Sequence, residues 1–148
     1  IGSDFETYKI CLNINTLVND KFDCYDRFNV LLKLSKRYPI VSPIASIISN
    51  IKPFNPNLNN LGQWNSGSWE MAEGLGHFVL RLIRCLQYCN INLNNDAISN
   101  VMAKEFYEKN INSALFPTDK TILPDPTKNN GFFKKFEIIN RGHTKQVY

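Results

Sequence analysis

Two stretches near the start of the chain alternate between apolar and polar positions. The apolar positions are Tyr8, Ile10, Leu12 and Ile14 in the first stretch, and Phe28, Val30, Leu32 and Leu34 in the second. A period of two is typical of a strand with one buried face. Asn19, Asp20 and Asp23 lie between the stretches and favour a hairpin loop. We therefore expect the two strands to pair in antiparallel orientation.

Two prolines end the second of these strands. Pro39 and Pro43 fix their own backbone φ and move the preceding residue out of the helical region. The segment that follows, residues 44–51 (IASIISNI), is rich in β-branched side chains and predicts a third strand. The sequence thus predicts an antiparallel meander of three strands.

The pattern changes after a polar loop over residues 57–68. Apolar side chains then recur at helical spacing at Leu75, Val79, Leu82, Ile83, Leu86 and Cys89. This spacing predicts a long amphipathic helix from Leu75 onward. A second helix is expected over about residues 96–112, with Asn94 or Asn95 as its cap.

The last part of the chain, residues 117–148, has a different character from residues 1–116. Its prolines at Pro117, Pro124 and Pro126 exclude a long helix. It also carries the apolar side chains Phe132, Phe133, Phe136, Ile138 and Ile139. We expect residues 1–116 to form the domain, and residues 117–148 to be an extension that packs on it or binds a partner.

Size and composition fit a single globular domain. The chain has 148 residues, of which 43% are hydrophobic and 20% are charged, and no apolar run approaches the length of a membrane span. The net charge of +4 is modest and the basic residues are scattered, so nucleic-acid binding is not expected. The cysteines at positions 11, 24, 85 and 89 form no C-x-x-C pair, which is typical of reduced thiols in the cytoplasm or nucleus.

The order of motifs resembles the core of the ubiquitin-conjugating enzymes. That family has a strand, Tyr-Pro, a further Pro, a strand, His-Pro-Asn, a Gly and then the catalytic cysteine. The matching residues here are Tyr38, Pro39, Pro43, Pro56, Asn57 and Gly62. The resemblance covers about Tyr8 to Asn112. It implies an α+β fold with an antiparallel meander of three to four strands, helices packed on it, and an N-terminal helix that is missing or short.

Two positions depart from the family's pattern. Asn55 stands where the family has His, and Asn65 stands where it has the cysteine that accepts ubiquitin as a thioester. Asn57 matches the Asn credited with stabilising the oxyanion. A carboxamide is not a nucleophile, so the resemblance implies a catalytically inactive variant without cofactors. Its implied role is regulation or binding in the conjugation pathway, with ubiquitin, a ubiquitin-like protein, an active conjugating enzyme or a ligase as partner.

Other interpretations remain open at this stage. An active enzyme would need a displaced cysteine, for which Cys24 is the one expected to be exposed, because Cys85 and Cys89 fall within the long helix. A third interpretation is an RWD-type interaction domain, which shares the meander and a Tyr-Pro signature. Asn55 and Asn57 also suit a purely structural role as hydrogen-bonding turn residues.

The remaining candidates favour packing over chemistry. His77, Cys85 and Cys89 lie close in the sequence, and His143 is the other histidine, but core packing is preferred to a zinc site, which needs three or four converging ligands. Trp69 is expected to anchor the core before the long helix. Trp64 is expected either to pack over its loop or to face a partner.

Overall fold

A computed structural model describes residues 5–118, 133–139 and 145–147, with side chains over residues 6–118. The elements in chain order are β1 (Phe5–Leu12), β2 (Thr16–Leu17), β3 (Cys24–Tyr25), β4 (Phe28–Ser35), β5 (Ile44–Ile47), the 3-10 turn Met71–Glu73, α1 (Leu75–Leu86), the 3-10 turn Asn95–Ala97, α2 (Val101–Lys109), β6 (Phe133–Ile139) and β7 (Lys145–Val147). The fold is of the mixed α+β class, as the sequence predicts.

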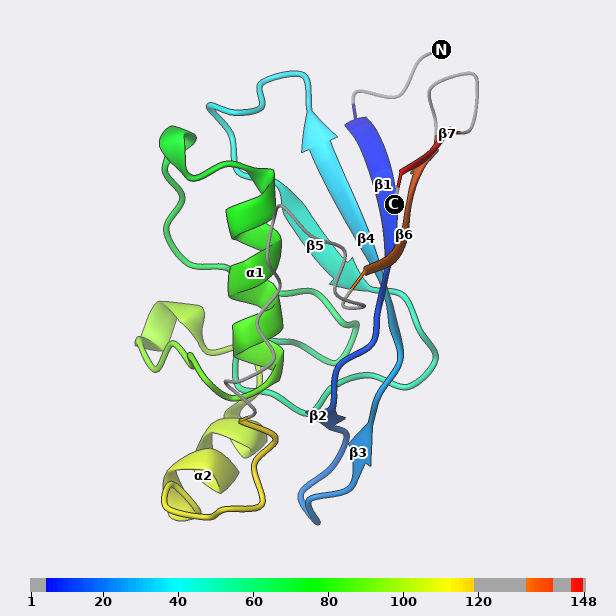
Figure 1. Ribbon diagram of the computed structural model, residues 1–148. Helices are drawn as coiled ribbons and strands as arrows, with labels where there is room; N and C mark the ends of the chain where they lie inside the picture. The colour runs from blue at the N-terminus through cyan, green and yellow to red at the C-terminus, as the bar shows by residue number, and fades with distance from the viewer. Residues whose placement is uncertain (1–4, 119–132, 140–144, 148) are drawn as a thin grey trace.

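The main sheet is antiparallel and has the strand order β5-β4-β1-β6-β7. The neighbouring strands β1, β4 and β5 are the predicted meander. β1 is not an edge strand, because β6 pairs with it on the side away from β4. The segment 133–139 of the expected extension therefore joins the sheet through its main chain (Figure 1). Pro124, Pro126, Phe132 and His143 lie outside the described residues.

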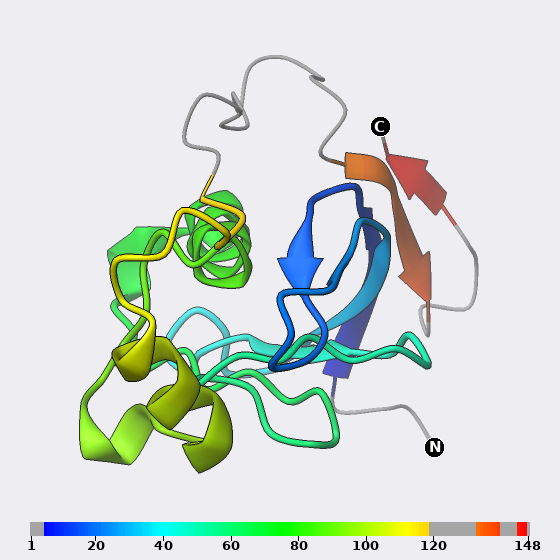
Figure 2. The ribbon, with the colours of Figure 1, turned by 90° about the horizontal axis from the view of Figure 1, so that it is seen from below.

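The core lies between α1 and one face of the sheet, and Figure 2 shows α1 end-on beside the strands. Alternate residues of β4 from Phe28 to Leu34 are buried, as expected of a strand with one buried face. The fully buried side chains shared by helix and sheet are Ile10, Leu12, Phe28, Val30, Leu32, Phe78, Leu82, Ile83 and Leu86. Removing these apolar side chains from water stabilises the packing of α1 on the sheet.

The third strand is shorter than the sequence predicts, because β5 ends at Ile47 rather than at residue 51. The hydroxyl of Ser49 accepts the N–H of Asn29 at 2.7 Å, and so replaces a main-chain carbonyl in the pairing with β4. Beyond this point the chain turns away from the sheet. The prediction was wrong at this end of the strand because β-branched composition does not determine which backbone N–H and C=O groups form hydrogen bonds with a neighbouring strand.

The helix boundaries also correct the predictions. α1 begins at Leu75 as expected but ends at Leu86, so Cys89 lies beyond it and does not share a helical face with Cys85. α2 begins at Val101 rather than near residue 96. Its cap is Asn100, whose side-chain oxygen accepts the N–H of Ala103 at 3.0 Å, and not Asn94 or Asn95. The backbone N–H of Asn100 bonds to the carbonyl of Pro56, which keeps the preceding 3-10 turn separate from α2.

A second apolar cluster joins the β2–β3 hairpin to α2 and the segment after it. Its buried members are Leu17, Tyr88 and Phe116, and the partly buried side chains packed against them are Phe22, Phe54, Ile91, Phe106 and Tyr107. The ring centroids of Phe22 and Phe106 are 4.9 Å apart, so the hairpin tip contacts α2 directly. This cluster holds the lower part of the molecule in Figure 1 together.

The loop between the Asn-Pro-Asn turn and α1 is attached to the edge of β5. The N–H of Ile47 donates to the carbonyl of Gly62 at 2.7 Å, and the N–H of Trp64 donates to the carbonyl of Ala45 at 3.1 Å. Gly62 has a φ of +82°, and a Cβ there would lie 2.4 Å from the Ile47 oxygen. Only glycine allows this approach without strain.

We predict that Gly62→Ala lowers the free energy of unfolding by about 2 to 4 kcal/mol, because it adds both a left-handed backbone penalty and a clash with main chain. The matched control is Gly76→Ala in α1, where a Cβ meets nothing within 4 Å. That variant should be more stable by about 0.5 to 1 kcal/mol. Urea unfolding measures both, and equal effects at the two glycines would contradict the packing described at Gly62.

Candidate functional site

The Asn-Pro-Asn turn is buried between the sheet and the end of α1. Asn55 is fully buried, and its side-chain N–H donates to the carbonyl of Cys85 at 2.9 Å. Its side-chain oxygen accepts the backbone N–H of Asn57 at 2.9 Å. Because a buried carboxamide is stable only when its polar atoms are paired, Asn55 fixes the turn against the last turn of the helix.

The carboxamide of Asn57 is also buried, and its oxygen and both of its N–H groups make hydrogen bonds. Its N–H groups donate to the carbonyls of Asn92 at 2.8 Å and Ala97 at 3.1 Å. Its oxygen accepts the backbone N–H of Asn92 at 3.0 Å and lies 3.5 Å from the sulfur of Cys85. Both N–H groups are thus committed to main-chain carbonyls, so in this structure neither is available to an oxyanion.

Asn65, the residue at the expected cysteine position, lies beside the turn. Its backbone N–H donates to the carbonyl of Asn57 at 2.8 Å. Its side-chain N–H donates to the carbonyl of Asp96 at 2.8 Å, and its side-chain oxygen accepts the N–H of Gly67 at 3.2 Å. The structure therefore brings Asn57 and Asn65 together. The side chains of both residues make hydrogen bonds to main-chain atoms of residues 92–97.

These residues border a polar cavity of about 370 Å³. It is lined by Asn57, Trp64, Asn65, Ser66, Arg81, Cys85, Asn90, Ile91, Asn92, Leu93 and Asn94. One wall comes from the loop after the turn, and the opposite wall comes from the segment after α1. Carboxamides, a hydroxyl and main chain dominate this lining, which suits an uncharged hydrogen-bonding ligand.

Arg81 borders the cavity but contributes little free charge to it. Its guanidinium makes a bidentate contact with the carboxylate of Glu73, at 2.7 and 3.1 Å. It also donates to the carbonyl of Ser66 at 2.7 Å, and it lies 5.6 Å from the ring centres of both Trp64 and Phe78. Arg81 therefore holds the loop wall against α1, a role that its position in the sequence did not reveal.

Cys85 is the site residue that the sequence analysis missed. Its thiol lies 3.5 Å from the side-chain oxygens of both Asn55 and Asn57, and it is only 3% exposed. Burial raises the pKa of this thiol to about 12, although the Trp64 indole, the Asn55 side chain and the Arg81 charge oppose that rise. Helical spacing indicated that Cys85 faces inward, but it could not show that the turn lies opposite.

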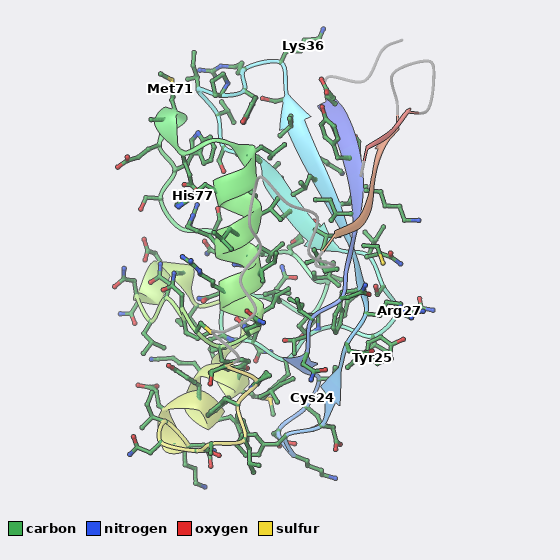
Figure 3. The ribbon with its side chains drawn as sticks, viewed as in Figure 1. Cys24, Tyr25, Arg27, Lys36, Met71 and His77 are labelled. Atoms are coloured by element: carbon green, nitrogen blue, oxygen red, sulfur yellow. The ribbon has the colours of Figure 1, made fainter. Side chains whose placement is uncertain are left out.

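The other thiols are not part of the cavity. Cys24 is exposed, as expected, but it lies on β3, and Figure 3 shows it beside Tyr25 at the hairpin end of the molecule. Burial, and then the neighbouring Asp23, raise the pKa of the Cys24 thiol. Cys11 and Cys89 are half-buried.

The Tyr38-Pro39 corner and the two tryptophans have structural roles. The peptide bond between Tyr38 and Pro39 is cis, and the carbonyl of Pro39 accepts the indole N–H of Trp69 at 2.8 Å. The rings of Trp64 and Trp69 both contact Phe78, at centroid distances of 5.1 and 5.8 Å. Trp64 therefore packs against α1 and the main core rather than over its own loop, and Trp69 joins the corner to the core. Pro43, which follows this corner in the sequence and directly precedes β5, is buried.

No metal centre forms within the described residues. The structure shows no group of three or more His, Cys, Asp or Glu side chains there that could hold an ion. His77 points outward from α1 in Figure 3, and its ring nitrogen lies 3.7 Å from the Glu73 carboxylate. Among the described helices, none combines the length and apolar character needed to cross a membrane.

The raised pKa of Cys85 predicts a dependence of stability on pH. The unfolded chain loses the thiol proton near pH 8.5 while the native protein keeps it to about pH 12, so the native state binds more protons in this window. The free energy of unfolding should then fall as pH rises through the window, by at most about 1.4 kcal/mol per pH unit from this group.

Urea unfolding of the natural protein and of Cys85→Ser, compared at pH 7 and at about pH 10, isolates the contribution of this thiol. The stability of the natural protein relative to Cys85→Ser should decrease between the two values. Cys24→Ser, which removes an exposed thiol, should show a much smaller change. Equal behaviour of the two variants would mean that Cys85 is accessible to solvent in the native state.

The chain matches no protein-family model, and comparisons with curated proteins and with solved structures find no significant match.

Proposed function

We propose that this protein is a catalytically inactive variant of the ubiquitin-conjugating fold. It acts as a regulatory or binding module in ubiquitin or ubiquitin-like conjugation. The observation that carries the proposal is the placement of Asn65 beside Asn57. The sequence resemblance assigns Asn65 to the position of the family's cysteine, and here its carboxamide is bonded to main chain.

The order of elements supports this assignment. The strands β1, β4 and β5 form the meander, the Asn-Pro-Asn turn follows β5, and α1 packs across the sheet. The cis Tyr38-Pro39 corner lies between β4 and β5, at the position of the motif that the resemblance rests on. The Asn-Pro-Asn turn also distinguishes the chain from an RWD-type domain, which lacks it.

Binding is the activity that the cavity can support without a nucleophile. Its lining includes the exposed side chains Asn90, Leu93 and Asn94. The carboxamides among them can pair with the main chain of an extended peptide. The carboxyl-terminal end of ubiquitin, which the family attaches at the position of Asn65, is such a peptide.

One observation favours the alternative of an active enzyme with a displaced cysteine. The Cys85 thiol borders the cavity and lies within hydrogen-bonding reach of Asn57. However, burial raises the pKa of this thiol to about 12, which disfavours the thiolate at neutral pH, and the thiolate is the species that attacks. Burial also blocks the approach of an acyl donor as large as ubiquitin.

A thioester assay separates the two functions. With activating enzyme, ATP and ubiquitin, we expect the natural protein to form no adduct that a reducing agent removes. Asn65→Cys is the informative companion, because it tests whether the scaffold accepts ubiquitin once a sulfur is supplied. A reducible adduct on the natural protein that is lost in Cys85→Ser would instead establish the displaced-cysteine enzyme.

The binding site is tested by introducing a charge at the rim of the cavity. Leu93 is 39% exposed and lines the cavity, and we expect Leu93→Asp to weaken ubiquitin or ubiquitin-like binding about tenfold. Leu61→Asp is the control, because Leu61 is 72% exposed and lies outside the lining. NMR titration measures both affinities. Equal losses, or no binding by the natural protein, would oppose the proposed site.

A further inference from the structure

The segment after α1 borders the same cavity as Cys85 and has little regular structure of its own. We name residues 90–97 the strap. Its residues Asn90, Leu93, Asn94, Asn95 and Asp96 are exposed. Apart from the short 3-10 turn at its end, it has no helix or strand. Segments with many exposed residues and few buried apolar contacts open with a smaller free energy than the core.

The strap is attached to the rest of the described chain mainly through two asparagines. Asn57 makes three hydrogen bonds to main chain of Asn92 and Ala97, and Asn65 makes one to the carbonyl of Asp96. Within the described residues, the main-chain bonds of the strap run to its own residues, such as that from Ala97 to Asn94. Side chains therefore hold the strap where a sheet or helix would use backbone pairing.

Apolar contacts fix the strap only near its ends. Ile91 packs against the aromatic cluster around Tyr88 and Phe116, and Ala97 is 2% exposed. Between these two anchors, Asn92, Leu93 and Asn94 line the cavity, and Cys85 of α1 lines the same cavity. Movement of residues 92–96 away from Asn57 and Asn65 would therefore widen the cavity and uncover the Cys85 thiol.

We propose that the strap is a gate over the cavity, and that the carboxamide of Asn57 sets the equilibrium between its closed and open forms. The closed form has the buried thiol described above. The open form exposes Cys85 and leaves the anchors at Ile91 and Ala97 and both apolar clusters intact. This gate is a property of the chain alone and does not depend on the proposed binding function.

The test uses Cys85 as the reporter of opening. Cys11→Ser, Cys24→Ser and Cys89→Ser together leave Cys85 as the only thiol, and its reaction with iodoacetamide is followed by mass spectrometry at several urea concentrations below the unfolding transition. Because strap opening exposes little surface, the labelling rate should depend only weakly on urea. Labelling through global unfolding would instead show the full urea dependence of unfolding.

In this background Asn57→Ala should raise the labelling rate about 10- to 100-fold, because it removes three bonds and leaves buried partners unpaired. Asn65→Ala, which removes one bond to the strap, should raise it by a smaller factor. The matched control is Asn19→Ala, since Asn19 also makes three side-chain bonds, all within the β2–β3 hairpin. It should leave the rate unchanged.

If Asn57→Ala lowers global stability, the urea dependence distinguishes the two routes to labelling, and Asn65→Ala provides a milder second variant. Two results together would overturn the gate. Cys85 in the parent background would be labelled with the urea dependence of global unfolding, and neither Asn57→Ala nor Asn65→Ala would be labelled faster than its own loss of global stability explains. The gate is equally overturned if Asn19→Ala accelerates labelling as much as Asn57→Ala does. No ubiquitin is present, so the result is independent of the binding titration.

Discussion

The buried carboxamide of Asn57 is the interaction on which the rest of the site depends. It bonds to main chain at Asn92 and Ala97 and contacts the thiol of Cys85. One side chain therefore joins the turn after the sheet, the last turn of α1 and the strap. Because a buried polar group costs free energy unless it is paired, these partners must keep fixed positions for the fold to be stable. The cavity exists because the three segments meet around this residue without filling the space beside it.

The same arrangement determines which polar groups of the site are already bonded within the protein. The groups that could stabilise an oxyanion at Asn57 are already donated to carbonyls, and the position beside the turn carries the carboxamide of Asn65. The available sulfur, on Cys85, is buried, and burial holds its pKa at about 12. The carboxamides of Asn57 and Asn65 are thus bonded within the protein, while Asn90 and Asn94 in the cavity lining are exposed. These exposed carboxamides are the groups on which the proposed peptide-binding role rests.

Two apolar clusters stabilise different parts of the molecule. The larger one lies between α1 and the sheet, and the smaller aromatic one lies between the β2–β3 hairpin and α2. The strap runs between them. Ile91 anchors it in the aromatic cluster, and the buried Ala97, whose carbonyl is bonded to Asn57, anchors its other end. Between these anchors the strap is bonded to the carboxamides of Asn57 and Asn65, and we propose that these bonds control its opening. The abundance of asparagine in this part of the chain thus has a structural use in the site, although composition alone could not reveal it.

The sequence by itself determined the elements whose signals are local. Alternation in residues 8–14 and 28–35 predicted β1 and β4, helical spacing from Leu75 predicted α1, and the prolines predicted the corner before β5. Only the tertiary structure decided where β5 stops, where α2 begins, and that β6 pairs with β1, because these depend on which distant backbone groups become partners. It also decided that Cys85 lies beside Asn57 and that Arg81 is paired with Glu73. Contacts across about 30 residues of chain leave no periodic trace in the sequence, since periodicity records which face of an element is buried and not what lies opposite it.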